Sequence, residues 1–342
     1  MDKPQLLVRS FPDPIPQESS SSWRGRWRRL RPTAPPLFRW VGPASALGAT
    51  LIGLTLGLSA CSSRSLPSAS TPVRSGALPT LRIAVLPAYA RAEQERIIAP
   101  LDAHLEKVLG QQVDFLFAEN YEDNVKMLLD GRANAAYTGP AIYLEARDRG
   151  ARIQPLAAPI DERTKRPWYR AAIIVASNGP IQTLADLKGK RIAFVAPTST
   201  SGYLVPLAAL TQVGLKPTRD FAAVVFGGNH TKTVALLETG KVDACATSLD
   251  SYRKQQASDQ PTVAQSRVLW QSDPIPHSPF VISEDLPPEL VEKLKEALLT
   301  VPPNLQDILG TPLLGYTLVT ATDYEPIQQL RVQLRMAKDS PK

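Results

Sequence analysis

The residues of this chain that could do chemistry gather in one short loop, Ser199-Thr200-Ser201-Gly202. An apolar run at 191–195 predicts a strand before the loop, and the spacing of apolar residues at 205–213 predicts a helix after it. The first amides of a helix have no partner within it, so with the neighbouring hydroxyls they can bind an anion. The local pattern also fits an ordinary strand-to-helix turn with a Ser or Thr cap, which is the more common structure.

This loop could hold an anion without a charged side chain, because it contains no Lys or Arg. Hydroxyls and backbone amides donate hydrogen bonds to the oxygens of a phosphorus oxyanion, and bonds to a charged acceptor are about twice as strong as neutral ones. A neutral set of donors can bind a small anion and still release it. The chemistry that the loop suggests is therefore reversible binding.

No pattern in the sequence predicts a catalytic or metal site. The chain has two cysteines, Cys61 and Cys245, and the second lies in an apolar run that indicates a small buried hydrophobe. None of the three histidines has a cysteine at zinc-ligand spacing. No Ser/His/Asp set stands at convincing positions, so we expect neither an enzyme nor a cofactor. A transferase with a two-lobed architecture stays open as a less favoured alternative.

Positive charge is concentrated at the start of the chain. The 342 residues are 43% hydrophobic, enough for about two domains with a sizeable core. The formal net charge is +7 and the isoelectric point is near 9.4. Residues 1–60 carry a net charge of +5, which leaves +2 for the remainder. Because the basic character belongs to the leader, nucleic-acid binding is not expected.

Residues 1–60 have the order of an export signal. A cluster of Arg and Trp at 23–31 precedes an uncharged apolar run at 41–58, and small residues lead to Cys61. The end of this segment resembles a bacterial lipobox, so Cys61 is the predicted lipidation site. The alternative is a transmembrane anchor, since the run is close to the lower limit of about 18 residues for a span. Residues 61–79 are rich in Ser and Pro and are predicted to be a flexible tether.

Strands and helices are expected to alternate through the rest of the chain, which predicts an α/β fold with a largely parallel sheet. Two such cycles suggest two lobes around a cleft, where small ligands bind. The expected strands are 81–86, 113–117, 133–137, 170–176, 191–195, 222–226, 242–247, 268–270 and 280–282. The expected helices are 92–109, 121–129, 142–146, 184–190, 205–213, 231–238, 288–300 and 305–309.

From about residue 81 to residue 309, the sequence resembles the phosphonate/phosphite/phosphate-binding proteins of ABC importers, a branch of the type II periplasmic binding proteins. The resemblance rests on motifs at 184–190, 197–206, 228–230, 240–244 and 275–279. The first motif occurs in many classes of binding protein. The hydroxyl loop, followed at family-like spacing by His230 and Asp243, is more specific.

The resemblance implies an α/β, two-lobed type II periplasmic-binding-protein fold with a ligand cleft between the lobes. One lobe would comprise residues 80–175 and 272–342, and the other 176–271. It further implies an extracytoplasmic solute-binding lipoprotein, periplasmic or at the cell surface, that is anchored to the membrane through Cys61 and serves an ABC permease and ATPase. We expect it to be a monomer. A ligand sensor that signals to a membrane kinase is the alternative, because the sequence does not separate the two roles.

The same resemblance implies which residues bind the ligand. The hydroxyls of the loop would hold the phosphorus oxygens, an imidazole would donate from a second loop of the same lobe, and a tyrosine would reach in from the first lobe. The predicted ligand-binding residues are Tyr121, Thr138, Ser199, Thr200, Ser201, His230, Asp250 and Ser278.

Each assignment has an ordinary structural alternative. His230 could be a satisfied loop histidine, Tyr121 a core aromatic at the start of a helix, and Asp250 an N-cap. An ionised carboxylate only accepts hydrogen bonds, so Asp250 in the pocket would favour a protonated phosphorus oxyanion or an aminoalkyl group over sulfate.

The chain departs from the family pattern at two positions. Thr138 stands where phosphonate binders commonly have an aromatic residue, and Ser278 stands where several have an acid. The missing acid removes a partner for a ligand amine. Phosphite, phosphate or a small alkylphosphonate is therefore expected in preference to an aminoalkylphosphonate.

Overall fold

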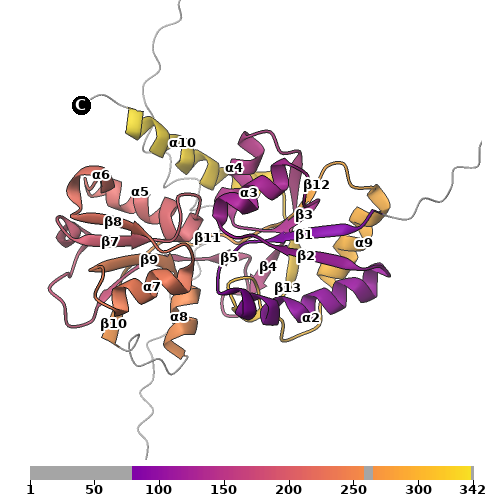
Figure 1. Ribbon diagram of the computed structural model, residues 1–342, viewed down its shortest axis with the longest axis horizontal. Coiled ribbons are helices and arrows are strands. Elements are labelled where there is room, and N and C mark those ends of the chain that lie inside the picture. The colour runs from indigo at the N-terminus through magenta and orange to yellow at the C-terminus, as the bar shows by residue number, and fades with distance from the viewer. Residues whose placement is uncertain (1–78, 258–264, 340–342) are drawn as a thin grey trace, which may run out of the picture. The chain divides into compact units, whose positions relative to one another are not determined.

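The computed structural model describes residues 79–257 and 265–339 (Figure 1). The leader, Cys61 and nearly all of the predicted tether lie outside these ranges. Within them, no helix combines the length and the apolar character needed to cross a membrane.

The first sheet has six strands in the order β13-β4-β12-β3-β1-β2. Strands β1 and β2 pair in parallel, as do β1 and β3, whereas β12 and β13 pair antiparallel with their neighbours. Helices α2 and α9 pack against each other, as do α3 and α4. The strands are β1 (Leu81–Val85), β2 (Val113–Phe117), β3 (Ala135–Tyr137), β4 (Ile153–Asp161), β12 (Phe280–Ser283) and β13 (Leu313–Leu318), and the helices are α2 (Arg91–Leu109), α3 (Tyr121–Leu129), α4 (Pro140–Asp148) and α9 (Pro288–Leu299).

The second sheet has five strands in the order β10-β6-β9-β7-β8 and is also mixed, because β6 pairs antiparallel with β9 and β10. The prediction of a largely parallel sheet is therefore wrong for both sheets. The strands are β6 (Ala171–Ala176), β7 (Arg191–Phe194), β8 (Ala223–Phe226), β9 (Ala244–Ser248) and β10 (Ser266–Gln271). The helical segments are η2 (Leu184–Leu187), η3 (Thr200–Leu204), α5 (Val205–Gln212), α6 (Pro217–Asp220), α7 (His230–Glu238) and α8 (Leu249–Ala257).

Helices cover both faces of the second sheet, as the side chains of strand β6 show. Successive side chains of a strand point to opposite faces. Ile173 and Val175 pack in one apolar cluster with Leu210 of α5, whereas Ile174 packs in another with Val234 of α7. Cys245 lies fully buried in the second cluster, as predicted for a small hydrophobe. A strand buried on both faces reads as a continuous apolar run, which made β6 predictable.

Two short strands connect the sheets. Along the chain, strand β5 (Trp168–Tyr169) comes between β4 and β6, and strand β11 (Ile275–Pro276) comes between β10 and β12. The two short strands pair antiparallel with each other. The chain thus passes from the first sheet to the second through β5 and returns through β11 (Figure 1). The division into lobes at residues 80–175 with 272–342 and 176–271 stays a proposal, but its boundary at 175 separates most of β6 from the second sheet, in which β6 pairs.

Several elements were not predicted, and the longest of them are β4, β13, α8 and α10 (Glu325–Asp339). Strand β4 contains Pro155 and Pro159, and proline in a sequence argues against a strand with partners on both sides. Both prolines lie where the register shifts, opposite Val281 and Tyr316, and such irregularities are where a sheet tolerates proline.

The helix predicted at 305–309 is wrong. Here the chain reverses, because Leu313 N–H donates to Leu305 O at 3.1 Å and Gln306 pairs with Pro312 in an antiparallel bridge. Gly310 adopts φ 66°, which glycine tolerates and which ends the turn. Leu305, Ile308 and Leu309 are buried at helix-like spacing although the segment is not helical, so their spacing was misleading.

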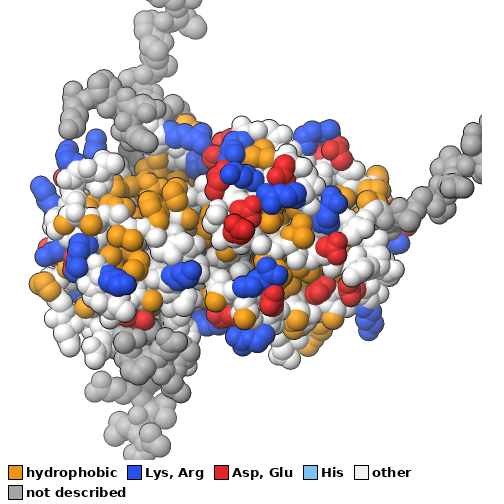
Figure 2. Space-filling model, in the orientation of Figure 1, with side chains coloured by type: hydrophobic (Ala, Val, Ile, Leu, Met, Phe, Trp, Pro, Cys, Tyr) orange, Lys and Arg blue, Asp and Glu red, His pale blue; other side chains and the backbone are white. Residues whose placement is uncertain are grey.

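Exposed apolar side chains gather over α5 and β8 (Figure 2). Val213, Val225 and Phe226 are between 37% and 47% exposed. In contrast, all eight predicted ligand-binding residues are buried, none being more than 6% exposed. The predicted site is therefore separate from this surface.

Candidate functional site

The hydroxyl loop leads from β7 into a continuous helical segment. Its first turn, η3, is π-helical and continues directly into α5. Ser199 caps this turn, since its Oγ accepts the N–H of Gly202 at 3.1 Å. A Cβ at Gly202 would lie 2.3 Å from Val195 Cγ2, so only glycine lets the turn approach the end of β7 this closely. The turn places three buried hydroxyls, from Ser199, Thr200 and Ser201, at the start of the helix.

Thr200 connects the two lobes through a hydrogen bond. Its Oγ1 accepts the N–H of Ala141 at 2.9 Å, and Ala141 lies in the first turn of α4. The amide end of α4, from the first lobe, therefore lies against the hydroxyl loop of the second. Both helix starts expose donors to the same region.

His230 is the first residue of α7, and its ring is held by the end of β9. Nδ1 lies 2.8 Å from Thr247 Oγ1, and the N–H of Ser248 donates to Nδ1 at 3.3 Å. Because Nδ1 accepts from an amide, the ring proton is on Nε2. Burial lowers the pKa of His230 to about 4, so the ring is neutral near pH 7. His230 can thus donate one hydrogen bond from Nε2 without contributing charge.

The loop that carries His230 runs beside the end of β7. Gly227 and Gly228 donate their N–H groups to Phe194 O and Val195 O, at 2.8 and 2.9 Å. The backbone N–H of His230 donates across to Ala88 O of the first lobe at 3.2 Å. These hydrogen bonds place the loop of His230 next to the hydroxyl loop.

Tyr121 begins α3, and the Asn120 side chain caps that helix by accepting the N–H of Asp123 at 2.9 Å. The Tyr121 hydroxyl is buried and has no hydrogen-bond partner among the described residues. Burial raises its pKa, and the nearby Ser199 side chain opposes the rise. A buried hydroxyl without a partner costs about 1 to 3 kcal/mol, so this group is ready to donate to an acceptor beside Ser199.

A buried hydrogen bond joins Thr138 to Asn124 of α3. Thr138 is fully buried, and its hydroxyl donates to Asn124 Oδ1 at 2.6 Å. The Nδ2 group of Asn124 is buried and, within the described part of the chain, has no partner. Asn124 is one helical turn beyond Tyr121, so α3 presents two unpaired donors on one face. The sequence analysis missed Asn124, although an Asn three residues after a site tyrosine is a usable signal.

Tyr169, on the crossing strand β5, was also missed. Burial raises its pKa, while the nearby side chains of Ser201 and Thr200 oppose the rise. Its ring packs against the ring of His277 with centroids 5.0 Å apart. In the sequence, Tyr169 is distinguished only by its place just before the apolar strand β6. It becomes a neighbour of the hydroxyl loop because the chain crosses between the sheets there.

Ser278 follows the second crossing strand and is buried. Its N–H donates to His277 Nδ1 at 2.8 Å, and His277 Nε2 lies 3.0 Å from Asp307 Oδ2. Asp307 Oδ1 also accepts the N–H of Thr311 at 2.8 Å. The segment that carries Ser278 is thus fixed to the turn that precedes β13.

Asp250 is buried in the first turn of α8, where its carboxylate pairs with Arg163. Burial raises the pKa of Asp250, and the Arg163 guanidinium opposes the rise. Asp250 is not the N-cap of α8, because Ser248 Oγ accepts the N–H of Ser251 at 3.0 Å and occupies that role.

These residues form a set of hydrogen-bond donors with no reactive group. In the ranges that the structure describes, no group of three or more His, Cys, Asp or Glu could hold a metal ion. Burial raises the pKa of Cys245, so its thiol is not an activated nucleophile. Hydroxyls, amides and a neutral imidazole suit an anion that is bound and released unchanged.

Two α/β sheets joined by two crossing strands, with buried donors where they meet, define the class of two-lobed periplasmic binding proteins. Two solved structures agree with this fold. A binding protein component of an ABC phosphonate transporter from Pseudomonas aeruginosa has a TM-score of 0.68 at 21% identity, over 75% of this chain and 86% of that one. PhnD1 of Prochlorococcus marinus, in complex with methylphosphonate, has a TM-score of 0.65 at 19% identity, over 75% of this chain and 98% of that one.

The family is shown by sequence. The model of the ABC transporter, phosphonate, periplasmic substrate-binding protein family matches residues 83–325, and the chain belongs to that family. The phosphate-import protein PhnD of Mycolicibacterium smegmatis is 31% identical over 247 residues, 69% of this chain and 76% of the relative. The phosphonates-binding periplasmic protein of Escherichia coli is 28% identical over 199 residues, 57% of this chain and 58% of the relative. The protein is therefore a substrate-binding transport component and not an enzyme.

Proposed function

We propose that this protein captures a small phosphorus oxyanion, namely phosphite, phosphate or a small alkylphosphonate, between its two lobes and passes it to an ABC permease. The observation that carries the proposal is the buried hydroxyl loop at the start of η3, with the neutral His230 beside it. The relatives named for phosphate import and phosphonate binding support the same class of ligand.

The eight predicted residues keep their proposed roles as ligand contacts. The loop hydroxyls, Tyr121 and His230 would donate to the phosphorus oxygens, and the unpaired Asn124 amide adds a further donor. Because all of these groups are buried, the ion would enter only when the lobes move apart. The crossing strands β5 and β11 would bend in that motion, since they alone connect the two sheets within the described ranges.

Calorimetric titration of the full chain tests the ligand class. The tightest ligand should be phosphate, phosphite or methylphosphonate. Sulfate should bind more weakly, because it has no O–H group that could donate a hydrogen bond to Asp250. Ser201→Ala should weaken the best ligand by about 1 to 3 kcal/mol, the scale for a hydrogen bond to a charged group. Thr198→Ala, which removes a half-buried hydroxyl from the same loop, is the matched control. If no phosphorus oxyanion binds to the wild type, the proposal is wrong.

We also propose that the protein is lipid-anchored through Cys61 and faces the periplasm or the cell surface. The support is the order of charge, apolar run and small residues before Cys61. Cys61→Ser should prevent lipidation and move the protein from the membrane fraction to the soluble fraction. Cys245→Ser is the control, because its thiol is buried in the second lobe. A Cys61→Ser variant that stays in the membrane would favour the transmembrane anchor instead.

A further inference from the structure

Arg163 lies next to the proposed site, and the proposed ligand-binding roles do not account for it. It lies in the turn between β4 and β5, and this turn is tied down by Asp161. Asp161 Oδ1 accepts the N–H of Thr164 at 2.7 Å, and the N–H of Asp161 donates to Arg166 O at 3.0 Å. The turn therefore places Arg163 shortly before the crossing strand β5, which begins at Trp168.

The guanidinium of Arg163 lies between two buried carboxylates. Its Nη2 donates to Asp250 Oδ1 and lies 3.7 Å from Asp161 Oδ2. The side chains of Asp161 and Asp250 are 4% and 7% exposed, whereas that of Arg163 is 48% exposed. Arg163 thus covers the two acids from the solvent side.

Asp250 belongs to the surroundings of the hydroxyl loop. It follows β9, whose Thr247 and Ser248 hold the ring of His230. Burial is the main cause of the raised pKa of Tyr169, and Asp250 adds to the rise, whereas the nearby side chains of Ser201 and Thr200 oppose it. A substituent on a bound phosphorus atom that points away from the loop would meet Tyr169 and then the pair of Asp250 and Arg163.

The other buried acid near Tyr169 is Asp307, whose Oδ2 has no hydrogen bond among the described residues. Asp307 accepts the N–H of Thr311 and lies 3.0 Å from His277 Nε2. Ser278, next to His277, supplies no carboxylate. Among the described residues, an ammonium group next to Asp250 would lie beside the positive charge of Arg163.

We propose that Arg163 determines the ligand class of this site by holding the Asp250 carboxylate, so that phosphonates with an ammonium group are excluded and phosphorus oxyanions without positive charge are accepted. This inference rests on the proposed function and adds the residue that sets its selectivity. Two like charges repel, and an acid that already pairs with Arg163 cannot compensate a second cation.

The test compares 2-aminoethylphosphonate with n-propylphosphonate, in which a methyl group replaces the ammonium group. Calorimetry on the full chain should show at least about tenfold weaker binding of the amine, equivalent to about 1.4 kcal/mol. Arg163→Gln should improve the relative affinity for the amine by about tenfold, because it frees Asp250. The double variant Arg163→Gln with Asp250→Asn should lose that improvement. Arg166→Gln, which removes an exposed charge from the same turn, should keep the wild-type ratio.

Each outcome decides the matter. Wild type that binds the amine as tightly as the propyl compound overturns the inference, and this holds even if the variants fail to fold. An Arg163→Gln protein that melts like wild type but keeps the ratio within about twofold, or does not bind the amine at all, also overturns it. The proposed function fails separately, when the wild type binds none of phosphate, phosphite and methylphosphonate.

Discussion

Single residues at the site differ in whether their polar atoms already have partners. Ser199 and Thr200 each accept an amide hydrogen, from Gly202 and Ala141, which fixes the orientation of their hydroxyls. The Tyr121 hydroxyl has no such partner among the described residues. A protein that buries an unpaired hydroxyl loses stability, and a ligand oxygen that accepts from it would recover the loss. Tyr121 is therefore the residue whose removal best separates binding from folding.

Tyr121→Phe should weaken binding of the best phosphorus oxyanion by about 1 to 3 kcal/mol, because one donor to a charged acceptor is lost. The free energy of unfolding of the unliganded protein should stay the same or rise by up to about 1 kcal/mol, since a buried unpaired group is removed. Calorimetry and urea unfolding measure the two effects. The control is Tyr143→Phe, whose hydroxyl accepts from Arg147 at 2.9 Å away from the loop. Unchanged affinity in Tyr121→Phe would remove this residue from the site.

His230 gives the protein a predictable sensitivity to acid. Burial lowers its pKa from 6.5 to about 4, so the folded state resists protonation. A group with a lowered folded-state pKa contributes its full stability above the unfolded pKa and loses it as the pH falls through the folded pKa. His230 should therefore cost about 3 kcal/mol of stability as the pH falls from above 6.5 to below 4.

His230→Gln should flatten this acid limb, because glutamine does not titrate. Urea unfolding between pH 8 and pH 4 measures the effect. The control is His104→Gln, because the His104 ring bonds to Ala297 O of α9, whereas His230 begins α7. Should the variant retain the full wild-type loss between these pH values, another group is responsible.

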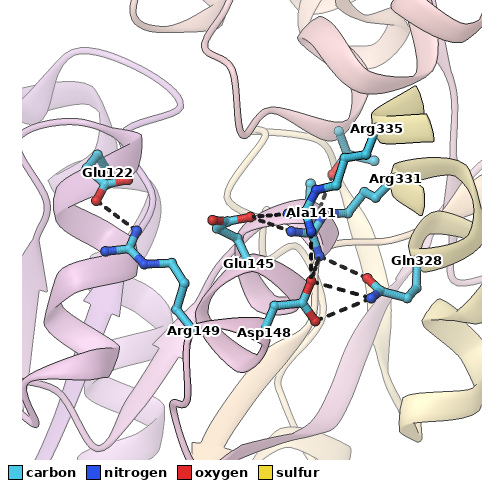
Figure 3. A network of polar contacts seen from close by, with 9 residues as sticks. Glu122, Ala141, Glu145, Asp148, Arg149, Gln328, Arg331 and Arg335 are labelled. Atoms are coloured by element: carbon cyan, nitrogen blue, oxygen red, sulfur yellow. Dashed lines mark hydrogen bonds and ion pairs between the residues drawn. The ribbon is translucent and has the colours of Figure 1, made fainter. Parts of the chain in front are cut away.

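At the scale of elements, the C-terminal helix α10 was not predicted, although it contacts both lobes. It packs against α4 of the first lobe and against η3 and α5 of the second. Arg331 is 6% exposed and pairs with both Glu145 and Asp148 of α4, with Nη1 3.0 Å from Asp148 Oδ2 (Figure 3). Arg335 adds a more exposed pair with Glu145 at 3.2 Å. Buried ion pairs are costly to break from one side, so Arg331 ties α10 to α4.

Arg331→Ala should destabilise the protein by about 1 to 3 kcal/mol, because two partly buried carboxylates lose their shared partner. Arg335→Ala, which removes a side chain that is 59% exposed, should cost less than about 1 kcal/mol. Urea unfolding of both variants makes the comparison. Equal effects from the two substitutions would mean that burial of the Arg331 pairs is not what holds α10.

Individual elements were predictable where the pattern of apolar residues is local. Helix α2 and strands β1, β2 and β7 follow their periodicity closely, whereas the prolines of β4 concealed a strand that only its partners β12 and β13 stabilise. The wrong helix at 305–309 has a different cause, because a local reversal of the chain, which pairs this segment with Pro312 and Leu313, decides its conformation. Local propensity is overridden wherever a segment gains more from distant partners.

At the scale of the whole molecule, the residues of the proposed site come together because the chain crosses between its sheets twice. Contacts between the lobes place the first lobe against the hydroxyl loop, the His230 loop and α8. They join Ala141 to Thr200, Ala88 to His230, and Tyr89 to Ser251 at 3.0 Å. Tyr169 and Ser278 reach the site only because β5 and β11, which are over 100 residues apart in sequence, pair with each other.

The sequence by itself determined the hydroxyl loop, the glycine that shapes it, the family resemblance and the eight candidate residues, because these depend on residue types at short spacing. Only the tertiary structure decided that Asn124 and Tyr121 keep donors without partners among the described residues, that Tyr169 joins them, and that Asp250 is held by Arg163. The physical reason is that pairing of a buried polar group depends on which distant segments pack around it. Spacing along the chain contains no such information.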